Sequence, residues 1–164
     1  MSEFIKVTEQ PGHYHHLEKK SIAEVLKLMN DEDKKVAFAI EKSLIKIEKL
    51  VEAITDKMLS GGRLFYIGAG TSGRMGILDA SEWCPTFGVP EGLVTGIIAG
   101  GTNAVTRAVE FAEDDSLAGW YDLEKYSVNH RDIVIGISAS GTTPYVSGAL
   151  GVCKGKGIPT GCIT

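Results

Sequence analysis

The chain has 164 residues, a formal net charge of −4, 43% hydrophobic residues and 23% charged residues. A chain of this length can bury a hydrophobic core without a disulfide bond or a structural metal ion. The negative charge argues against a nucleic acid as partner, and the apolar runs are too short to cross a membrane. We therefore expect a globular protein that holds any anionic ligand with local hydroxyl groups and dipoles.

Three cysteines, Cys84, Cys153 and Cys162, lack the spacing of a redox motif or of a metal site. A polar segment follows Met1, in place of the apolar run that a secretory signal requires. We expect reduced thiols, no bound metal ion and a cytoplasmic location.

The first 60 residues are predicted to form an extended arm followed by helices. Residues 1–20 are polar and aperiodic, and their histidines lack the partner ligands of a metal site. A short helix is expected over Ser21–Met29, and Asn30 is expected to cap a second helix that ends before Gly61. The second helix carries an apolar stripe at helical spacing, formed by Ile40, Leu44, Ile47, Val51, Ile54 and Met58. We expect residues 1–60 to pack on the following domain or on a partner subunit.

After Gly62 the pattern changes to short apolar strands that alternate with helical stretches. The expected strands cover residues 63–70, 94–100, 132–139 and 159–164. The expected helices cover residues 72–82, 103–122 and 144–156. Apolar strands separated by helices indicate an α/β fold in which a parallel sheet carries helices on both faces. Residues 61–164 are therefore predicted to be one α/β domain, which we expect to continue beyond the strand that ends at Thr164.

The first strand runs into a glycine-rich turn that reads Gly68-Ala69-Gly70-Thr71-Ser72-Gly73. The turn matches GxGxxG, but the second strand ends without the acidic residue that holds the ribose in a dinucleotide site. No lysine follows the last glycine, which argues against a nucleotide-binding P-loop. Backbone N–H groups, two hydroxyls and a helix N-terminus remain, and together they suit one phosphate group. We expect Thr71, Ser72 and Gly73 to bind it.

A second turn, from Ser138 to Pro144, occupies the same place between a strand and a helix. It carries four hydroxyl side chains, which is more than helix capping requires, and Pro144 suits the first helical turn. In a parallel sheet both turns lie at the carboxyl ends of the strands, where ligands bind. The two turns therefore predict a site for a small phosphorylated molecule, without a cofactor.

At these turns the chain resembles the sugar isomerase (SIS) domain family of phosphosugar-binding proteins. In that family a Ser-x-Ser-Gly-x-Thr turn holds the phosphate, and the resemblance assigns this role to Ser138, Ser140, Gly141 and Thr143. It also implies a flavodoxin-like, three-layer fold in which the first turn lines the same pocket.

Further motifs are similar to the N-acetylmuramic acid 6-phosphate etherase family and extend over nearly the whole chain. The matching segments are residues 8–9, 30–33, 67–74, 78–82, 85–90, 98–101, 108–115 and 138–145. The resemblance implies a cytoplasmic lyase of cell-wall amino-sugar recycling. Its substrate would be a sugar 6-phosphate, its products N-acetylglucosamine 6-phosphate and D-lactate, and its assembly a homodimer.

The implied reaction removes the C2 proton of the open-chain sugar, expels lactate from C3 and then adds water. Such an elimination needs a base at C2 and an acid at the leaving oxygen, and two carboxyl groups with separated pKa values can supply both. By the resemblance, Glu82 is the acid and Glu113 the base, although Glu110, Asp114 and Asp115 lie close to the base in sequence.

Two positions depart from the family pattern. Trp83 follows the expected acid where the family commonly has cysteine, and Thr142 stands where the family commonly has arginine. A sugar-phosphate isomerase would share the fold, both turns and a base. A non-catalytic phosphosugar sensor, such as the vertebrate glucokinase regulator that is similar to this family, is the other alternative.

Overall fold

The computed structural model describes residue 8 and residues 10–164, so Glu9 of the family-like pair at residues 8–9 lies outside the described part. The chain forms two compact units, Met1–Glu52 and Ala53–Thr164. The first unit contains the short 3-10 helix η2 (Leu17–Lys19), the helix α1 (Ile22–Glu41) and the start of α2 (Leu44–Leu59).

Helix α1 begins with a reciprocal cap at Ser21. The Ser21 hydroxyl accepts a hydrogen bond from the Glu24 backbone at 3.3 Å, and the Glu24 carboxylate accepts one from the Ser21 backbone at 2.8 Å. The helix then continues through Asn30, so the predicted break and cap at Asn30 are wrong. Neither glycine nor proline occurs in α1, and an ion pair of 2.6 Å between Glu32 and Lys35 supports the turn after Asn30.

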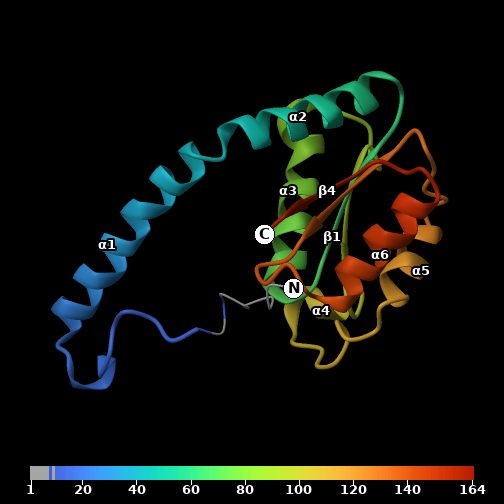
Figure 1. Ribbon diagram of the computed structural model, residues 1–164. Coiled ribbons are helices and arrows are strands. Elements are labelled where there is room, and N and C mark those ends of the chain that lie inside the picture. The colour runs from blue at the N-terminus through green and yellow to red at the C-terminus, as the bar shows by residue number, and fades with distance from the viewer. Residues whose placement is uncertain (1–7, 9) are drawn as a thin grey trace, which may run out of the picture. The chain divides into compact units, whose positions relative to one another are not determined.

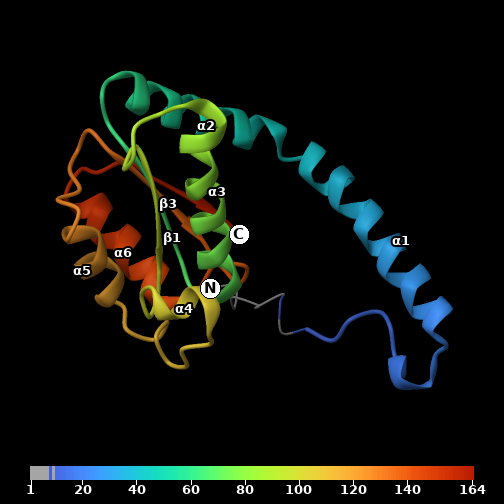
Figure 2. The same cartoon turned by 180° about the vertical axis from the view of Figure 1, so that it is seen from behind.

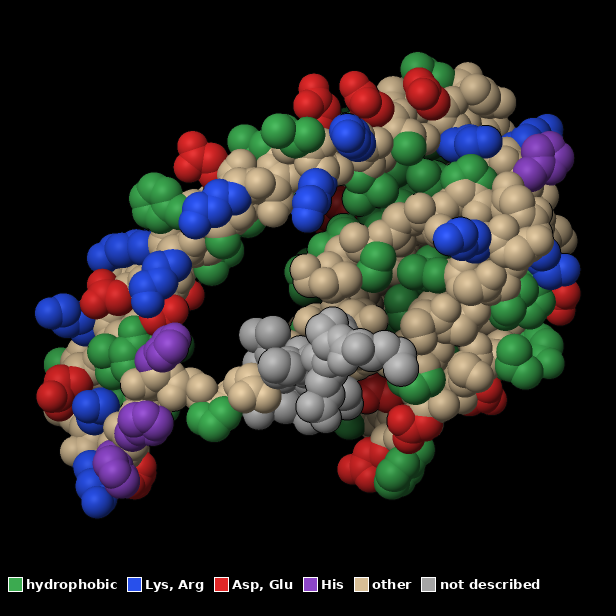
Figure 3. Space-filling model, in the orientation of Figure 1, with side chains coloured by type: hydrophobic (Ala, Val, Ile, Leu, Met, Phe, Trp, Pro, Cys, Tyr) green, Lys and Arg blue, Asp and Glu red, His purple; other side chains and the backbone are tan. Residues whose placement is uncertain are grey.

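No residue of α1 or α2 is buried, although both helices are rich in apolar residues. Figure 3 shows hydrophobic side chains at the surface along these helices, next to charged ones. Ile22, Leu26 and Met29 are exposed, and they follow one another at the spacing of a helical face. Among the described helices, none is both long enough and apolar enough to span a lipid bilayer.

The second unit is built on a four-stranded sheet in which all strands are parallel, in the order β2-β1-β3-β4. Its strands are β1 (Leu64–Gly68), β2 (Val94–Ile98), β3 (Ile133–Ile137) and β4 (Thr160–Ile163). The strands β1 and β3 are almost entirely buried, as expected of the centre of a parallel sheet. The predicted parallel α/β fold is confirmed.

Helices cover both faces of this sheet (Figures 1 and 2). The helix α3 (Gly70–Phe87) lies on one face, and α5 (Ala118–Glu124) and α6 (Pro144–Gly155) lie on the other. The core between the sheet and α5 and α6 is aliphatic and aromatic, and its most buried members are Phe65, Ile67, Leu123, Val134, Tyr145 and Cys153. The three-layer arrangement places the carboxyl ends of β1 and β3 at one edge, beside the two predicted turns.

One predicted helix, over residues 103–122, is wrong. The chain instead forms the single turn α4 (Asn103–Thr106), an irregular segment over residues 107–117 and then α5. In this segment Phe111 has a left-handed φ of 60°, which an α-helix does not accommodate. The Asp115 carboxylate accepts backbone hydrogen bonds just before α5 and thereby favours a new helix start there.

Helix α3 is longer than predicted at both ends. It begins at Gly70 rather than at Ser72. It passes through Pro85 and ends at Phe87, whereas the predicted helix ended at Glu82. It ends at Gly88, whose φ of 65° is the left-handed conformation typical of a helix terminus.

An ion pair stabilises the opposite end of the sheet, where the central strands β1 and β3 begin. Asp132 is 2% exposed and accepts three hydrogen bonds from Arg63 and one from the Asn129 backbone. Burial raises the pKa of Asp132, but the hydrogen bonds and the guanidinium charge outweigh burial and lower its pKa overall.

Candidate functional site

The first glycine-rich turn brings the start of α3 very close to the end of β1. A Cβ atom on Gly73 would lie 2.5 Å from the Ile98 side chain and 2.8 Å from the Gly68 carbonyl oxygen, so only glycine fits there without movement. Two residues with hydroxyl side chains follow Gly70 in the first turn of α3. Thr71 is exposed and Ser72 is half-buried, and both lie where the backbone N–H groups of the helix have no helical acceptor.

The second turn holds its hydroxyl groups in one hydrogen-bonded cluster before α6. The Ser138 and Thr143 oxygens lie 2.9 Å apart, and the Ser138 and Ser140 oxygens lie 3.5 Å apart. The backbone N–H of Gly141 donates to the Ser138 hydroxyl at 3.1 Å, and Gly141 itself has a φ of 68°. The cluster therefore presents several hydroxyls at the N-terminus of a helix, an arrangement suited to a phosphate oxygen.

Thr142, at the position where the etherase family commonly has arginine, belongs to the same cluster. Its hydroxyl donates to the Ser140 oxygen at 3.0 Å, and its backbone N–H reaches the same oxygen at 3.2 Å. Thr142 therefore fixes the Ser140 side chain and adds no charge to the turn.

The segment that carries Glu113 is hydrogen-bonded directly to the start of α6, beside the second turn. The Glu113 carbonyl oxygen accepts a hydrogen bond of 3.0 Å from the backbone N–H of Tyr145, in the first turn of α6. Tyr145 is 1% exposed, and its hydroxyl donates to Asp122 at 2.6 Å. Burial, followed by this hydrogen bond, raises the pKa of Tyr145, so its hydroxyl stays neutral and acts as an anchor. Glu113 thus lies next to this hydroxyl-rich turn, and its own side chain is exposed.

A cavity of about 250 Å³ connects the first turn with the segment that carries Glu113. Of the predicted site residues, Thr71 and Glu113 line this cavity, and Glu110 lines it as well. Arg74 is the cation among the lining residues, and no role was predicted for it from the sequence. The signal in the sequence that could have indicated a role for Arg74 was its position in the first turn of α3, directly after Gly73.

Glu82 lies away from this cavity in the same chain. It is twelve positions after Gly70 on one continuous helix, so it stands about 18 Å further along α3 at the helical rise per residue. Its side chain is exposed. The structure therefore brings Thr71 and Glu113 together but leaves Glu82 on a separate surface of α3.

Trp83, the aromatic residue beside Glu82, is engaged with other groups. Its indole N–H donates to the Asp79 carboxylate at 3.1 Å, and its ring lies 5.3 Å from the Phe87 ring. Burial first, and then a hydrogen bond to Asp79, raise the pKa of Tyr66. Trp83 therefore packs along α3 and helps to hold Asp79 in place.

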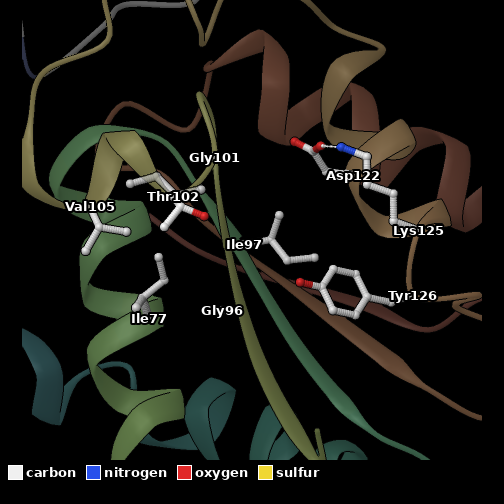
Figure 4. Close-up of a pocket in the computed structure, with 10 residues that line it drawn as sticks. Ile77, Gly96, Ile97, Gly101, Thr102, Val105, Asp122, Lys125 and Tyr126 are labelled. Carbon is white, nitrogen blue, oxygen red and sulfur yellow. Dashed lines mark hydrogen bonds and ion pairs between the residues drawn. The ribbon is translucent and has the colours of Figure 1, made fainter.

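A larger cavity, of about 390 Å³, lies at the exposed edge of β2 and contains none of the predicted site residues. Figure 4 shows Asp122 and Lys125 on one side, paired at 2.7 Å, and Ile77 and Val105 on the other side, with Ile97 between them. The two charged side chains are thus engaged with each other, while Thr102 and Tyr126 also line the cavity. Within residues 8 and 10–164, no group of three or more histidine, cysteine or acidic side chains is arranged to hold a metal ion.

Known proteins with similar sequences belong to the SIS-domain and etherase families, as the sequence motifs predict. The model of the glucokinase regulatory protein N-terminal SIS domain matches residues 46–154. An N-acetylmuramic acid 6-phosphate etherase of Bacteroides fragilis strain YCH46 is 56% identical over 161 residues, covering 98% of this chain and 57% of that protein. An enzyme of the same name from Porphyromonas gingivalis strain W83 is 56% identical over 98% of this chain and 58% of its own length.

A more distant relative of the same name, from Clostridium botulinum strain Eklund 17B, is 54% identical over 88% of this chain and 48% of its own length. The chain thus spans about half the length of these relatives. The domain match covers both turns and all of the sheet except its last strand. The predicted relationship is confirmed, and the chain belongs to the SIS-domain family represented by the N-terminal domain of the glucokinase regulatory protein.

Proposed function

We propose that the full-length protein is an N-acetylmuramic acid 6-phosphate etherase, which releases D-lactate and N-acetylglucosamine 6-phosphate. The observation that carries the proposal is the junction of Glu113 with the hydroxyl-rich turn at the start of α6. A base held beside a phosphate-type turn suits proton abstraction from a sugar phosphate. Relatives that are 56% identical and bear this name support the same substrate.

The phosphate is proposed to bind at the two helix N-termini. Ser138, Ser140, Gly141 and Thr143 would surround it from the α6 side through hydroxyl and backbone donors. Thr71, with Ser72 and Gly73 beside it, would contact the ligand from the α3 side. Binding through the positive ends of helix dipoles fits a chain whose net charge is −4.

The chemistry is an elimination followed by an addition. The Glu113 carboxylate takes the C2 proton, the electron pair forms the C2–C3 double bond, and the C3–oxygen bond to lactate breaks. Glu82 donates its proton to the departing lactate oxygen. Water then adds at C3 of the unsaturated aldehyde, and a proton returns to C2. Each acid or base group contributes about 10²–10⁴-fold to such a reaction.

Because Glu82 lies about 18 Å along α3 from the first turn, one chain does not place acid and base together. We therefore propose that the enzyme is a homodimer in which each site combines Glu113 of one subunit with Glu82 of the other. The outer face of α3 supports this arrangement, because Met75 and Leu78 are 60% and 64% exposed and lie at helical spacing with Glu82.

A shallow, mainly apolar hollow of about 370 Å³ lies on this same face, lined by Met75 and Leu78 among others. A two-fold axis through Leu78 would pair two α3 helices antiparallel and cover both hollows. Glu82 is four positions after Leu78, so Glu82 of the partner subunit would stand level with Arg74, four positions before Leu78. Arg74 lines both the hollow and the cavity that contains Glu113.

The proposed location is the cytoplasm. Cys84, Cys153 and Cys162 all carry free thiols, as expected in a reducing compartment.

The reaction is tested by adding N-acetylmuramic acid 6-phosphate to the full-length protein in D₂O and following it by proton NMR. We expect D-lactate to appear while deuterium enters C2 of the product, and we expect Glu113→Gln to lose both signals. Exchange at C2 without lactate would instead indicate isomerase-like chemistry. Binding of the sugar phosphate without either signal would indicate a non-catalytic sensor and would overturn the proposal.

A further inference from the structure

Arg74 makes an unusual set of contacts for an arginine beside a proposed phosphate site. Its Nε donates to the carbonyl oxygens of Ala104 at 3.1 Å and Val105 at 3.0 Å, and its Nη2 donates to that of Arg107 at 3.2 Å. These carbonyls belong to α4 and to the residue that follows it. The guanidinium thus caps α4 from a helix thirty residues earlier in the chain.

This cap defines one end of the segment that carries Glu113. The other end is held at the Glu113 carbonyl itself, through the backbone of Tyr145. Between the two anchors Phe111 adopts a left-handed φ of 60° and is 80% exposed, whereas Ala112 packs against the core. The backbone position of Glu113 therefore depends on the two anchors and on the packing of Ala112.

Within residues 8 and 10–164, Arg74 forms no ion pair with a carboxylate. In the described part of the chain, no acidic oxygen lies within 4.0 Å of its guanidinium. Glu110 and Glu113 line the same cavity as Arg74. Arg74 thus keeps its positive charge while it lines a cavity that is proposed to hold the base and the substrate.

We propose that Arg74 is a positioning residue that sets the place of the Glu113 carboxylate by capping α4. The proposal rests on the proposed function, because it assigns Arg74 to the proton-abstraction step. A displacement of about 1 Å at a reacting group can cost about 100-fold in rate. Loss of the cap should therefore reduce turnover, while the phosphate turn before α6, which Arg74 does not contact, keeps its affinity.

The test measures kcat and KM for lactate release by the full-length protein carrying Arg74→Lys, which keeps the charge but lacks the planar fork. We expect kcat to fall about 10–100-fold and KM to change less than about threefold, with C2 deuterium exchange slowed as much as lactate release. Methylguanidine should restore part of the activity of Arg74→Ala, because it can occupy the vacated cap. Ser140→Ala, in the proposed phosphate turn, provides the contrasting pattern, which is a raised KM. Arg107→Ala is the matched control, because it also removes an arginine side chain, but one that is exposed.

Unchanged kcat in Arg74→Lys would overturn the proposal. So would a change confined to KM, which would make Arg74 a phosphate ligand. If Arg74→Lys does not fold, the methylguanidine experiment on Arg74→Ala decides, since absence of rescue in a folded protein contradicts the positioning role. Failure of the proposed function is separate, because the unsubstituted protein would then release no lactate.

Discussion

At the scale of single residues, the polar groups at the two ends of the strands have different roles. Where β3 ends, the hydroxyl oxygens of Ser138 and Thr143 lie 2.9 Å apart beside the N-terminus of α6. Where β1 and β3 begin, Arg63 donates three hydrogen bonds to Asp132, and the Asn129 backbone donates a fourth. The first pair is suited to binding and the second to stability, although both consist of polar groups at strand ends.

The Asp132 ion pair predicts a specific dependence of stability on pH. Its pKa in the folded protein is below the ordinary value of 3.8, so its contribution is present at neutral pH and is lost as the pH falls through the folded pKa. Asp132→Asn should lower the free energy of unfolding at pH 7 by about 3 kcal/mol, near the low end for a broken buried pair because Arg63 stays partly exposed.

Urea unfolding at pH 7 and at pH 3 checks this prediction. The difference between the original protein and Asp132→Asn should shrink at the lower pH, because pH 3 lies below the ordinary pKa of 3.8, at which the carboxylate of the unfolded chain binds a proton. A difference that is the same at both values would show that the ion pair does not contribute as proposed.

At the scale of elements, the strands and turns could be predicted from the sequence because their signals are local. Apolar runs followed by glycine and hydroxyl residues located β1, β3 and both turns, and the structure has them there. The segment after α4 could not be predicted, because the cap from Arg74 that accompanies the helix end comes from thirty residues away. Nor could the role of Arg74 be inferred, since its partners are backbone carbonyls that leave no pattern in the sequence.

The continuity of α1 through Asn30 illustrates another limit. Asparagine is a good helix cap, but α1 already has a reciprocal cap at Ser21 and meets no helix-breaking residue at Asn30. The separation of Glu82 from the first turn, by contrast, could have been counted from the sequence once both were assigned to one helix.

The close approach of α3 and β1 yields a prediction for Gly73. Gly73→Ala should cost about 1–3 kcal/mol in stability and displace the first turn, because the new methyl group meets the Gly68 carbonyl, which cannot rotate away. Gly151→Ala in α6 is the matched control, since its Cβ would meet nothing within 4 Å, and it should be neutral or stabilising by up to about 1 kcal/mol. Thermal unfolding of the two variants makes the comparison, and equal effects would contradict the steric argument.

At the scale of the whole molecule, the cavity beside Glu113 contains Glu110 but not Glu82, the residue that is proposed to act as the acid. Glu82 lies on the exposed face of α3 with Met75 and Leu78, a surface that suits contact with a second copy. Contact between two such faces, as proposed, would cover the exposed apolar side chains and bring Glu82 of one subunit to the site of the other. The proposed activity and the proposed dimer therefore depend on each other.

The most direct test is a heterodimer of the full-length protein in which one subunit carries Glu82→Gln and the other Glu113→Gln, purified through two different affinity tags. Each variant alone should be inactive. In the heterodimer one of the two sites regains both carboxylates, so lactate release should return to about half of the unsubstituted rate per dimer. A heterodimer as inactive as the two parent variants would contradict a site shared between subunits and, with it, the assignment of Glu82 as the acid.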